Sequence, residues 1–322
     1  MVNEFRPYPI IAGPTASGKT AVAIELAKRL DGEVVSADSM QIYEEIFIGT
    51  ARPTADEMQG IPHHLLGFLP LSEAYSVARY TEDADQAFRD IISRGKTPIL
   101  CGGTGLYIQS FSENIQFFPQ EPNETLRSQL KSRASAEGAA VLLAELHKVD
   151  PETASRLHEN DVNRIVRALE VYHTTGQTIS EQARLSRSVP SPYARCLFLL
   201  NYRDRSKLYD RIERRVDRML NDGLMDEAAR VHNCDPRATV LQAIGYKELL
   251  PYIRGEESFD HAVEQLKTST RHYAKRQLSW FNRMEGVRTI FVDDYADIPT
   301  LVNDIEQQYN AFCKEGRRDG EE

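Results

Sequence analysis

Residues 13–20, GPTASGKT, constrain the fold of this chain more than any other segment. They carry the G-x-x-x-x-G-K-[ST] spacing of a phosphate-binding loop. The apolar residues 10–12 precede the loop, and Val22, Leu26 and Leu30 recur at helical spacing after it. The pattern therefore predicts a strand, a loop and a helix in succession, as in the phosphate-binding half of an α/β core.

Three features of this loop can hold a phosphate. Backbone N–H groups and the positive end of the following helix can surround the phosphate, and Lys19 adds a positive charge. The hydroxyl of Thr20 can bind Mg²⁺, so we expect Mg²⁺ as the cofactor and Thr20 as its protein ligand. The loop alone leaves the chemistry open, because many enzymes of different activity share it.

The composition is that of a globular protein without a membrane segment. With 322 residues and 41% hydrophobic content, the chain can bury a substantial core, and we expect two domains. The first residues form neither a signal peptide nor a transit peptide, and no apolar run approaches the roughly 20 residues that span a bilayer. We therefore expect a soluble, cytoplasmic protein with no membrane partner, and we also expect a monomer.

Cysteine spacing and net charge indicate whether a metal site of cysteines or a nucleic-acid partner should be expected. The four cysteines are far apart in the sequence, so we expect reduced thiols and no cysteine metal site. A net charge of −9 argues against a nucleic-acid partner on average, but a local basic surface could still bind one.

Five short apolar runs are candidate strands, and helical patterns separate them. These runs are residues 8–12, 33–36, 97–101, 195–200 and 289–292. The alternation predicts an α/β core with a largely parallel sheet.

A long polar segment between the third and fourth runs predicts a helical insertion domain. We expect a core of residues 1–111 and 193–313, an insertion of residues 112–192 and a disordered tail of residues 314–322. Prolines in residues 117–123 and 187–193 make these two segments candidate hinges.

Polar residues follow the second and third candidate strands. Ligands bind beyond the carboxyl ends of strands in an open α/β sheet, so Asp38 and Thr104 should face the same crevice as the phosphate-binding loop. Asp38 could bind Mg²⁺ or deprotonate a substrate, as in a kinase, or it could cap a turn with Ser39. The position alone leaves these alternatives open.

Nine segments together resemble the tRNA dimethylallyltransferases of bacterial type, also called tRNA isopentenyltransferases. They are GPTASGKT, DSMQIY, IGTARP, PHHL, GGTGLY, RIVRALEVYHTTG, LYDRIERRVDRM, AIGYKE and TRHYAKRQLSWF. They occur in the family's order and cover nearly the whole chain. Three positions depart from the usual pattern. Gly67 stands where an acidic residue is common, Arg52 where lysine is common, and Asn282 where a basic residue is common, although Arg283 could substitute for the last.

The resemblance implies a fold and a reaction. The fold is a P-loop nucleoside-triphosphate-hydrolase-like α/β core with a largely parallel sheet and a helical insertion domain. The reaction moves a dimethylallyl group from dimethylallyl diphosphate to the exocyclic amino nitrogen, N6, of the adenosine 3′-adjacent to the anticodon in tRNA. Both tRNA, through its anticodon stem-loop, and dimethylallyl diphosphate are then partners, and the loop holds a diphosphate leaving group.

The resemblance also assigns roles to individual residues. An exocyclic adenine amine is a poor nucleophile, so Asp38 is the expected general base, while Thr104 and Arg127 match positions that contact the reacting groups. On sequence grounds alone, Arg127 is equally well explained as a solvated helix residue. The implied diphosphate-binding residues are Gly13, Thr15, Ala16, Ser17, Gly18, Lys19, Thr20 and Arg215.

Contact with RNA is expected from basic segments and from the same resemblance. Residues 203–218 place Lys207, Arg211 and Arg215 or Arg218 on one helical face, and residues 270–283 mix cations with aromatic side chains. An ordinary amphipathic helix explains the latter pattern as well. The implied tRNA-binding residues are Asp38, Ser39, Met40, Gln41, Asn163, Arg164, Ile165, Val166, Arg167, Gln242, Gly245, Tyr246, Lys247, Lys275, Arg276 and Gln277.

Two other enzyme classes remain as alternatives. An adenylate isopentenyltransferase modifies a free adenine nucleotide, but such a ligand has no anticodon arm that would need the insertion or the basic C-terminal segment. A P-loop kinase for a small molecule would use Asp38 to deprotonate a hydroxyl group.

Overall fold

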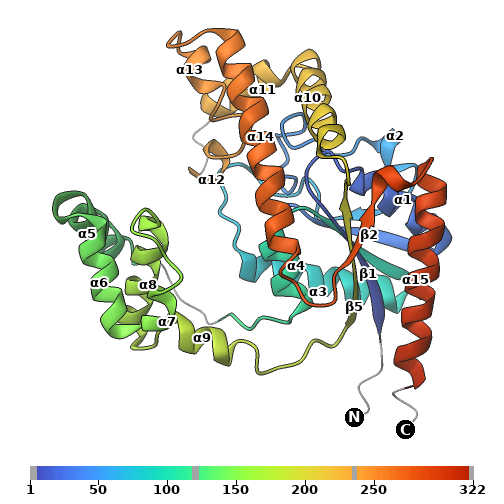
Figure 1. The fold of residues 1–322 in the computed structure, drawn as a ribbon, viewed down its shortest axis with the longest axis horizontal. Helices are drawn as coiled ribbons and strands as arrows, with labels where there is room; N and C mark the ends of the chain where they lie inside the picture. The colour runs from blue at the N-terminus through green and yellow to red at the C-terminus, as the bar shows by residue number, and fades with distance from the viewer. Residues whose placement is uncertain (1–5, 118–122, 234–237, 319–322) are drawn as a thin grey trace. The chain divides into compact units, whose positions relative to one another are not determined.

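The computed structural model describes residues 6–117, 123–233 and 238–318 (Figure 1). The chain divides into two compact units. We call residues 1–112 and 191–322 the core unit, and residues 113–190 the insertion unit.

The core unit contains a six-stranded sheet in the order β3-β2-β4-β1-β5-β6, in which every paired strand is parallel. Its strands are β1 (Pro7–Ala12), β2 (Gly32–Ala37), β3 (His63–His64), β4 (Thr97–Gly102), β5 (Ala194–Asn201) and β6 (Arg288–Phe291). The predicted fold class is confirmed, and each of the five candidate runs contains a strand. The strand β3 was not predicted, because a strand of two residues shows no periodicity.

Helices cover both faces of this sheet (Figure 1). Successive strand residues point to opposite faces, so Ile10 and Ile11 of β1 belong to different apolar clusters. On one face, α1 (Lys19–Arg29) and α15 (Ile298–Arg318) pack against the sheet. On the other lie α3 (Val77–Ser93), α4 (Gly105–Ser112), α10 (Arg205–Asn221) and the long α14 (Phe259–Phe281).

A third apolar cluster holds the segment after β2 against three helices. Ile42, Tyr43 and Ile46 pack with residues of α10, α11 (Leu224–Asn233) and α14, and with Tyr246. Short elements complete the unit: α2 (Ala55–Met58), α12 (Ala238–Leu241), α13 (Leu250–Ile253) and the 3₁₀ helix η1 (Val292–Asp294). This cluster gives the irregular segment after β2 a fixed course.

The insertion unit is helical and has its own core. Its helices are α5 (Glu124–Glu137), α6 (Ala139–Val149), α7 (Pro151–Ala154), α8 (Val162–Thr175) and α9 (Ile179–Leu185). Leu130, Leu142, Leu146, Ile165 and Leu169 are buried in one cluster. Of the two candidate hinges, residues 118–122 lie outside the described residues, and residues 187–193 contain the boundary between the units.

The predicted disorder of residues 314–322 is wrong for residues 314–318, because α15 continues to Arg318. The buried side chains of Leu301, Ile305 and Tyr309 hold this helix on the sheet. Adding a residue to an established helix costs little, whereas starting a helix is unfavourable. The remaining tail residues, 319–322, lie outside the described part of the chain.

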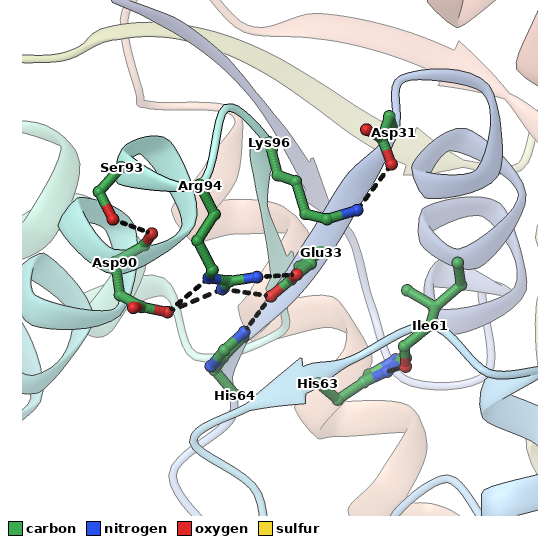
Figure 2. Close-up of polar contacts among 9 residues, drawn as sticks. All are labelled: Asp31, Glu33, Ile61, His63, His64, Asp90, Ser93, Arg94 and Lys96. Atoms are coloured by element: carbon green, nitrogen blue, oxygen red, sulfur yellow. Dashed lines mark hydrogen bonds and ion pairs between the residues drawn. The ribbon is translucent and has the colours of Figure 1, made fainter.

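A buried carboxylate joins three strands near the amino end of the sheet (Figure 2). Glu33 of β2 is 2% exposed, and both of its oxygens accept hydrogen bonds from Arg94, which lies just before β4. Nε2 of His64 in β3 lies 2.7 Å from Oε2 of the same carboxylate. The Arg94 guanidinium, aided by His64 and opposed by burial, lowers the pKa of Glu33 to about 2. One histidine of the PHHL motif thus has a structural contact.

In the described part of the chain, we find no helix long and apolar enough to cross a bilayer.

Candidate active site

The phosphate-binding loop connects β1 to α1, and its shape depends on two glycines. Gly13 has φ of +156°, and a Cβ there would lie 2.9 Å from the Leu200 carbonyl oxygen. Gly18 caps α1 with φ of 92°, in the left-handed region that glycine adopts most easily. The predicted strand, loop and helix are confirmed.

Hydrogen bonds from two cations hold the loop in this shape. Nζ of Lys19 donates to the Pro14 carbonyl oxygen at 2.7 Å, and Nε of Arg211 donates to that of Ala16 at 2.8 Å. Ser17 is 1% exposed, and its hydroxyl oxygen has no hydrogen-bond partner among the described residues. The loop therefore holds Lys19 close beyond the carboxyl end of β1, while the Ser17 N–H donates to the Pro14 carbonyl oxygen.

The positive charges of Lys19 and Arg215 lie in a partly desolvated environment. Burial lowers the pKa of Lys19 to about 8, and the charge of Arg215 adds to this effect. Burial also lowers the pKa of Arg215, which in the described residues has neither a hydrogen bond nor an ion pair. Two such cations favour an anionic ligand, because a bound anion would compensate for their lost hydration.

Asp38 follows β2 directly, and its two carboxylate oxygens have different surroundings. Oδ1 accepts hydrogen bonds from the backbone N–H groups of Met40 at 2.9 Å and Gln41 at 3.3 Å. Within the described residues, Oδ2 has no hydrogen-bond donor. Asp38 therefore caps a turn, as one sequence alternative proposed, and still offers a free oxygen.

Thr104 adjoins Asp38 at the carboxyl end of β4. Its Oγ1 accepts a hydrogen bond from the Ser39 N–H at 3.0 Å, and its own N–H donates to the Ala37 carbonyl oxygen at 3.0 Å. The structure thus places the two predicted catalytic residues of the core on neighbouring loops.

These loops meet at a cavity of about 350 Å³ in the core unit. Most of the residues proposed for the diphosphate and for tRNA in this unit line it. They are Thr15, Lys19, Thr20, Asp38, Ser39, Met40, Gln41, Arg215, Gln242, Gly245, Tyr246, Lys247, Arg276 and Gln277. A volume of this size is typical of a small-molecule site.

A second cavity, of about 770 Å³, adjoins the same phosphate-binding loop. Lys19, Thr20 and Arg215 line both cavities. The second is also lined by Ala16, Gly18, Arg52, Arg211, Arg214 and Arg218. Much of the basic face of α10 that the sequence suggested for RNA therefore lies beside the phosphate-binding loop.

The predicted residues of the insertion unit divide into exposed and buried positions. Asn163 and Arg164 are exposed on α8, whereas Ile165 and Val166 are 0% and 2% exposed in the core of the unit. The apolar side chains of Ile165 and Val166 therefore belong to the core of the unit, and their predicted contact with tRNA stays a prediction. The motif match covers consecutive residues, but a helix turns them toward different faces.

Arg127 and Arg167 share one buried carboxylate in the insertion unit. Nε of Arg127 lies 2.8 Å from Oε2 of Glu170, and Nη1 of Arg167 lies 3.0 Å from the same oxygen. Glu170 is fully buried; burial raises its pKa, but the hydrogen bonds from Arg127, Asn123 and Arg167 outweigh this and lower it. The predicted roles of Arg127 and Arg167 toward substrates stay predictions.

The three predicted tRNA-binding residues of α14 differ from one another in exposure. Lys275 and Arg276 are exposed, and Arg276 lies over the Tyr273 ring at 5.7 Å. Gln277 is only 6% exposed, and its amide group bonds to backbone atoms of Thr15 and Gly103. Gln277 also lines the first cavity, and its predicted contact with tRNA stays a prediction.

Glu227, which was not predicted from the sequence, organises one wall of the first cavity. Its carboxylate accepts hydrogen bonds from the N–H groups of Phe47, Ile48 and Gly49, at 2.8–2.9 Å. It also accepts one from the Tyr246 hydroxyl at 2.9 Å. Glu227 is 1% exposed. No local pattern distinguishes it from an ordinary acidic helix residue.

The two unusual residues at positions 52 and 67 contact each other. The Arg52 guanidinium donates to the carbonyl oxygens of Tyr43 and Glu44 and lies 3.5 Å from the centre of the Phe47 ring. A Cβ at Gly67 would overlap this guanidinium, and Gly67 has φ of +54°. Glycine at position 67 thus leaves room for arginine at position 52.

Comparison with known proteins agrees with this arrangement. The family model described as IPP transferase matches residues 41–284. The chain is 44% identical to a tRNA dimethylallyltransferase of a Thermoanaerobacter species, over 92% of this chain and 95% of that protein. It is 46% identical to one from Exiguobacterium sibiricum, over 86% of each.

Solved structures give the same result. A tRNA isopentenylpyrophosphate transferase from Bacillus halodurans has a TM-score of 0.70 and 37% identity, covering 98% of this chain and 100% of that one. A eukaryotic dimethylallyltransferase acting on tRNA has a TM-score of 0.75 and 31% identity, covering 90% of this chain and 75% of that one. The chain therefore belongs to the tRNA dimethylallyltransferase family.

Proposed function

We propose that this protein transfers the dimethylallyl group of dimethylallyl diphosphate to N6 of the adenosine 3′-adjacent to the anticodon in tRNA. The observation that carries the proposal is the meeting of the phosphate-binding loop and Asp38 at one cavity, in a chain of this family. The products are N6-dimethylallyladenosine in tRNA and diphosphate.

The reaction needs a base at one end and anion stabilisation at the other. As N6 forms its bond to C1 of the dimethylallyl group, the bond from C1 to the diphosphate oxygen breaks, and an N6 proton passes to Oδ2 of Asp38. Loop N–H groups, Lys19 and Arg215 stabilise the charge that grows on the leaving diphosphate. The loop thus binds a leaving group, and no phosphoryl group is transferred.

The residues present fit a Mg²⁺ ion that is bound mainly by the diphosphate. Among the described residues, no group of three histidine, cysteine or acidic side chains could hold a metal by itself. Thr20 lines both cavities, and Mg²⁺ often combines few protein ligands with phosphate oxygens and water. When bound there, Mg²⁺ supplies positive charge to the leaving diphosphate.

The RNA partner has a separate set of contacts in this proposal. Lys275 and Arg276 on α14, and Arg164 in the insertion unit, are exposed cations that can bind phosphates. An enzyme that modifies a base must take it out of the stack, and an anticodon loop offers unpaired bases. Because one chain contains both substrate loops, we propose a monomer that acts on tRNA in the cytoplasm.

The deciding experiment mixes purified protein, Mg²⁺, labelled dimethylallyl diphosphate and an anticodon stem-loop, without ATP or GTP. We expect label in the RNA at the adenosine next to the anticodon. Label on free AMP, ADP or ATP would indicate the adenylate enzyme instead. Transfer of phosphate from ATP to a small molecule, with no prenylated product, would indicate a kinase.

A further inference from the structure

Gln277 joins two loops of the active site that are far apart in the sequence. Its Oε1 accepts a hydrogen bond from the Thr15 N–H at 2.8 Å, and its Nε2 donates to the Gly103 carbonyl oxygen at 2.9 Å. With the side chain 6% exposed, both polar ends of the amide are engaged inside the protein.

Close packing of α14 on the segment after β4 fixes this bridge. A Cβ at Gly103 would overlap the Gln277 amide nitrogen, and one at Gly105 would lie 2.5 Å from a ring atom of Trp280. Glycine at these two positions lets α14 approach the backbone directly. The Gln277 amide therefore has little freedom to turn toward a ligand.

The two bridged loops carry opposite ends of the proposed reaction. Thr15 belongs to the loop that binds the leaving group. Gly103 precedes Thr104, which bonds to Ser39 and Ala37 on either side of the base Asp38. The Gln277 amide therefore links the loop that binds the leaving group, through Thr15, to the segment after β4, through Gly103. That segment is in turn bonded to the residues on either side of Asp38.

We propose that Gln277 is a positioning residue that sets the distance between the diphosphate and the general base, and that it does not bind RNA. The inference rests on the proposed function. Displacement at C1 requires the attacking nitrogen and the leaving oxygen in line, and a misplacement of about 1 Å can cost about 10²-fold in rate. A rigid link between the two loops supplies this alignment.

The first test is Gln277→Met, which keeps the length of the side chain and removes both hydrogen bonds. We expect the single-turnover rate at saturating substrates to fall by about 10- to 100-fold. The stem-loop Kd should stay within about threefold of the parent, because the amide is turned inward. Affinity for inorganic diphosphate, measured by calorimetry, should fall, because Thr15 loses its anchor.

Two control variants distinguish positioning by Gln277 from RNA binding and from a general effect of substitution. Lys275→Met, at the exposed neighbouring position on α14, should weaken stem-loop binding. Gln307→Met, at an exposed position on α15, should change neither the rate nor either affinity.

Gln277→Glu supplies a signature that a merely structural role would lack, and it serves if the methionine variant does not fold. Its ionised carboxylate would repel the Gly103 carbonyl oxygen, whereas its protonated form could donate to that oxygen as the amide does. We therefore expect the rate relative to the parent to rise as the pH is lowered from about 8 to about 5.5.

Some results would overturn the proposal. One is a raised stem-loop Kd with the parent's single-turnover rate, which would restore Gln277 as an RNA contact. Another is a rate relative to the parent that does not change with pH in Gln277→Glu. A parent protein that prenylates no RNA would refute the proposed function, while unchanged diphosphate affinity in Gln277→Met would separately refute the anchoring of Thr15.

Discussion

The two carboxylate oxygens of Asp38 differ in their surroundings, so two substitutions can separate the capping of the turn from the proposed role as base. Asp38→Asn keeps an oxygen for the Met40 N–H and removes the base, whereas Asp38→Ala removes both. We expect each to lower the single-turnover rate by about 10²–10⁴, with tRNA affinity nearly unchanged. Only the alanine variant should also lose about 1 kcal/mol of stability, measured by chemical unfolding. A rate within a few-fold of the parent in Asp38→Asn would exclude Asp38 as the base.

Lys19 gives diphosphate binding a pH dependence whose sign follows from its charge. Burial places the pKa of Lys19 near 8 without ligand, and a bound anion favours the protonated form. Affinity for inorganic diphosphate should therefore fall as the pH rises above 8, by up to about tenfold per pH unit. Calorimetry between pH 6.5 and about 9.5 measures this. Lys19→Met should bind weakly and lose this part of the dependence; an equally steep profile in that variant would assign the effect to another group.

Prediction from sequence succeeded for residues whose role depends on near neighbours in the chain. The loop of residues 13–20 and the position of Asp38 after a strand are local patterns, and the structure brings both to one cavity. The bridge by Gln277 to Thr15 joins residues 262 positions apart, and Glu227 reaches Gly49 over 178 positions. Only the packing of α14 and α11 onto the loops creates such contacts.

At the scale of secondary-structure elements, Glu33, His64 and Arg94 form a cluster that connects β2 to β3 and to the residues just before β4. Because the pKa of Glu33 is lowered from 4.5 to about 2, its ion pair contributes on the order of 3 kcal/mol above pH 4.5, and this is lost as the pH falls through 2. Glu33→Gln should therefore lower the unfolding midpoint at neutral pH, and the difference from the parent should shrink below pH 4.5.

Asp31→Asn is the matched control for this cluster (Figure 2). Asp31 is 82% exposed, and its ion pair with Lys96 is a surface contact of small value. An equal loss of stability in both variants, or a constant effect of Glu33→Gln across pH, would contradict the assignment.

Some strands and helix ends could be predicted from the sequence and others could not, and the difference has a physical reason. Of the five longer strands, β1, β2, β4 and β5 were predictable because they are short, mostly apolar runs that are largely buried on both faces. The edge strand β6 is buried only at Ile290, and it was predicted from its apolar residues alone. The edge strand β3 consists of two residues, which pair with Val34 and Val35 of β2. Its place in the sheet therefore depends on β2, and its own two residues carry no strand pattern. Likewise, α15 extends into the charged residues 314–318 because the earlier residues of the helix already pack on the sheet.

At the scale of the whole molecule, the proposed RNA contacts come from both units. Neutralising Arg164 and Lys275 together should raise the tRNA KM and reduce the log–log salt dependence of binding by about 0.7–0.9 per lost contact. The KM for dimethylallyl diphosphate should stay near that of the parent. Neutralising Lys131 and Lys314, two exposed lysines outside the proposed contacts, is the control. Equal salt slopes in both double variants would mean that the proposed pair is an ordinary solvated surface.

Lys19 and Thr20 line two cavities, and with the proposed function this arrangement has a kinetic consequence. We expect a diphosphate held by the loop to exchange with solvent through the arginine-lined cavity while an RNA base occupies the cavity that contains Asp38. Neither substrate then has to leave before the other. Product inhibition should reflect this independence: inorganic diphosphate should compete with dimethylallyl diphosphate, yet saturating tRNA should not relieve its inhibition.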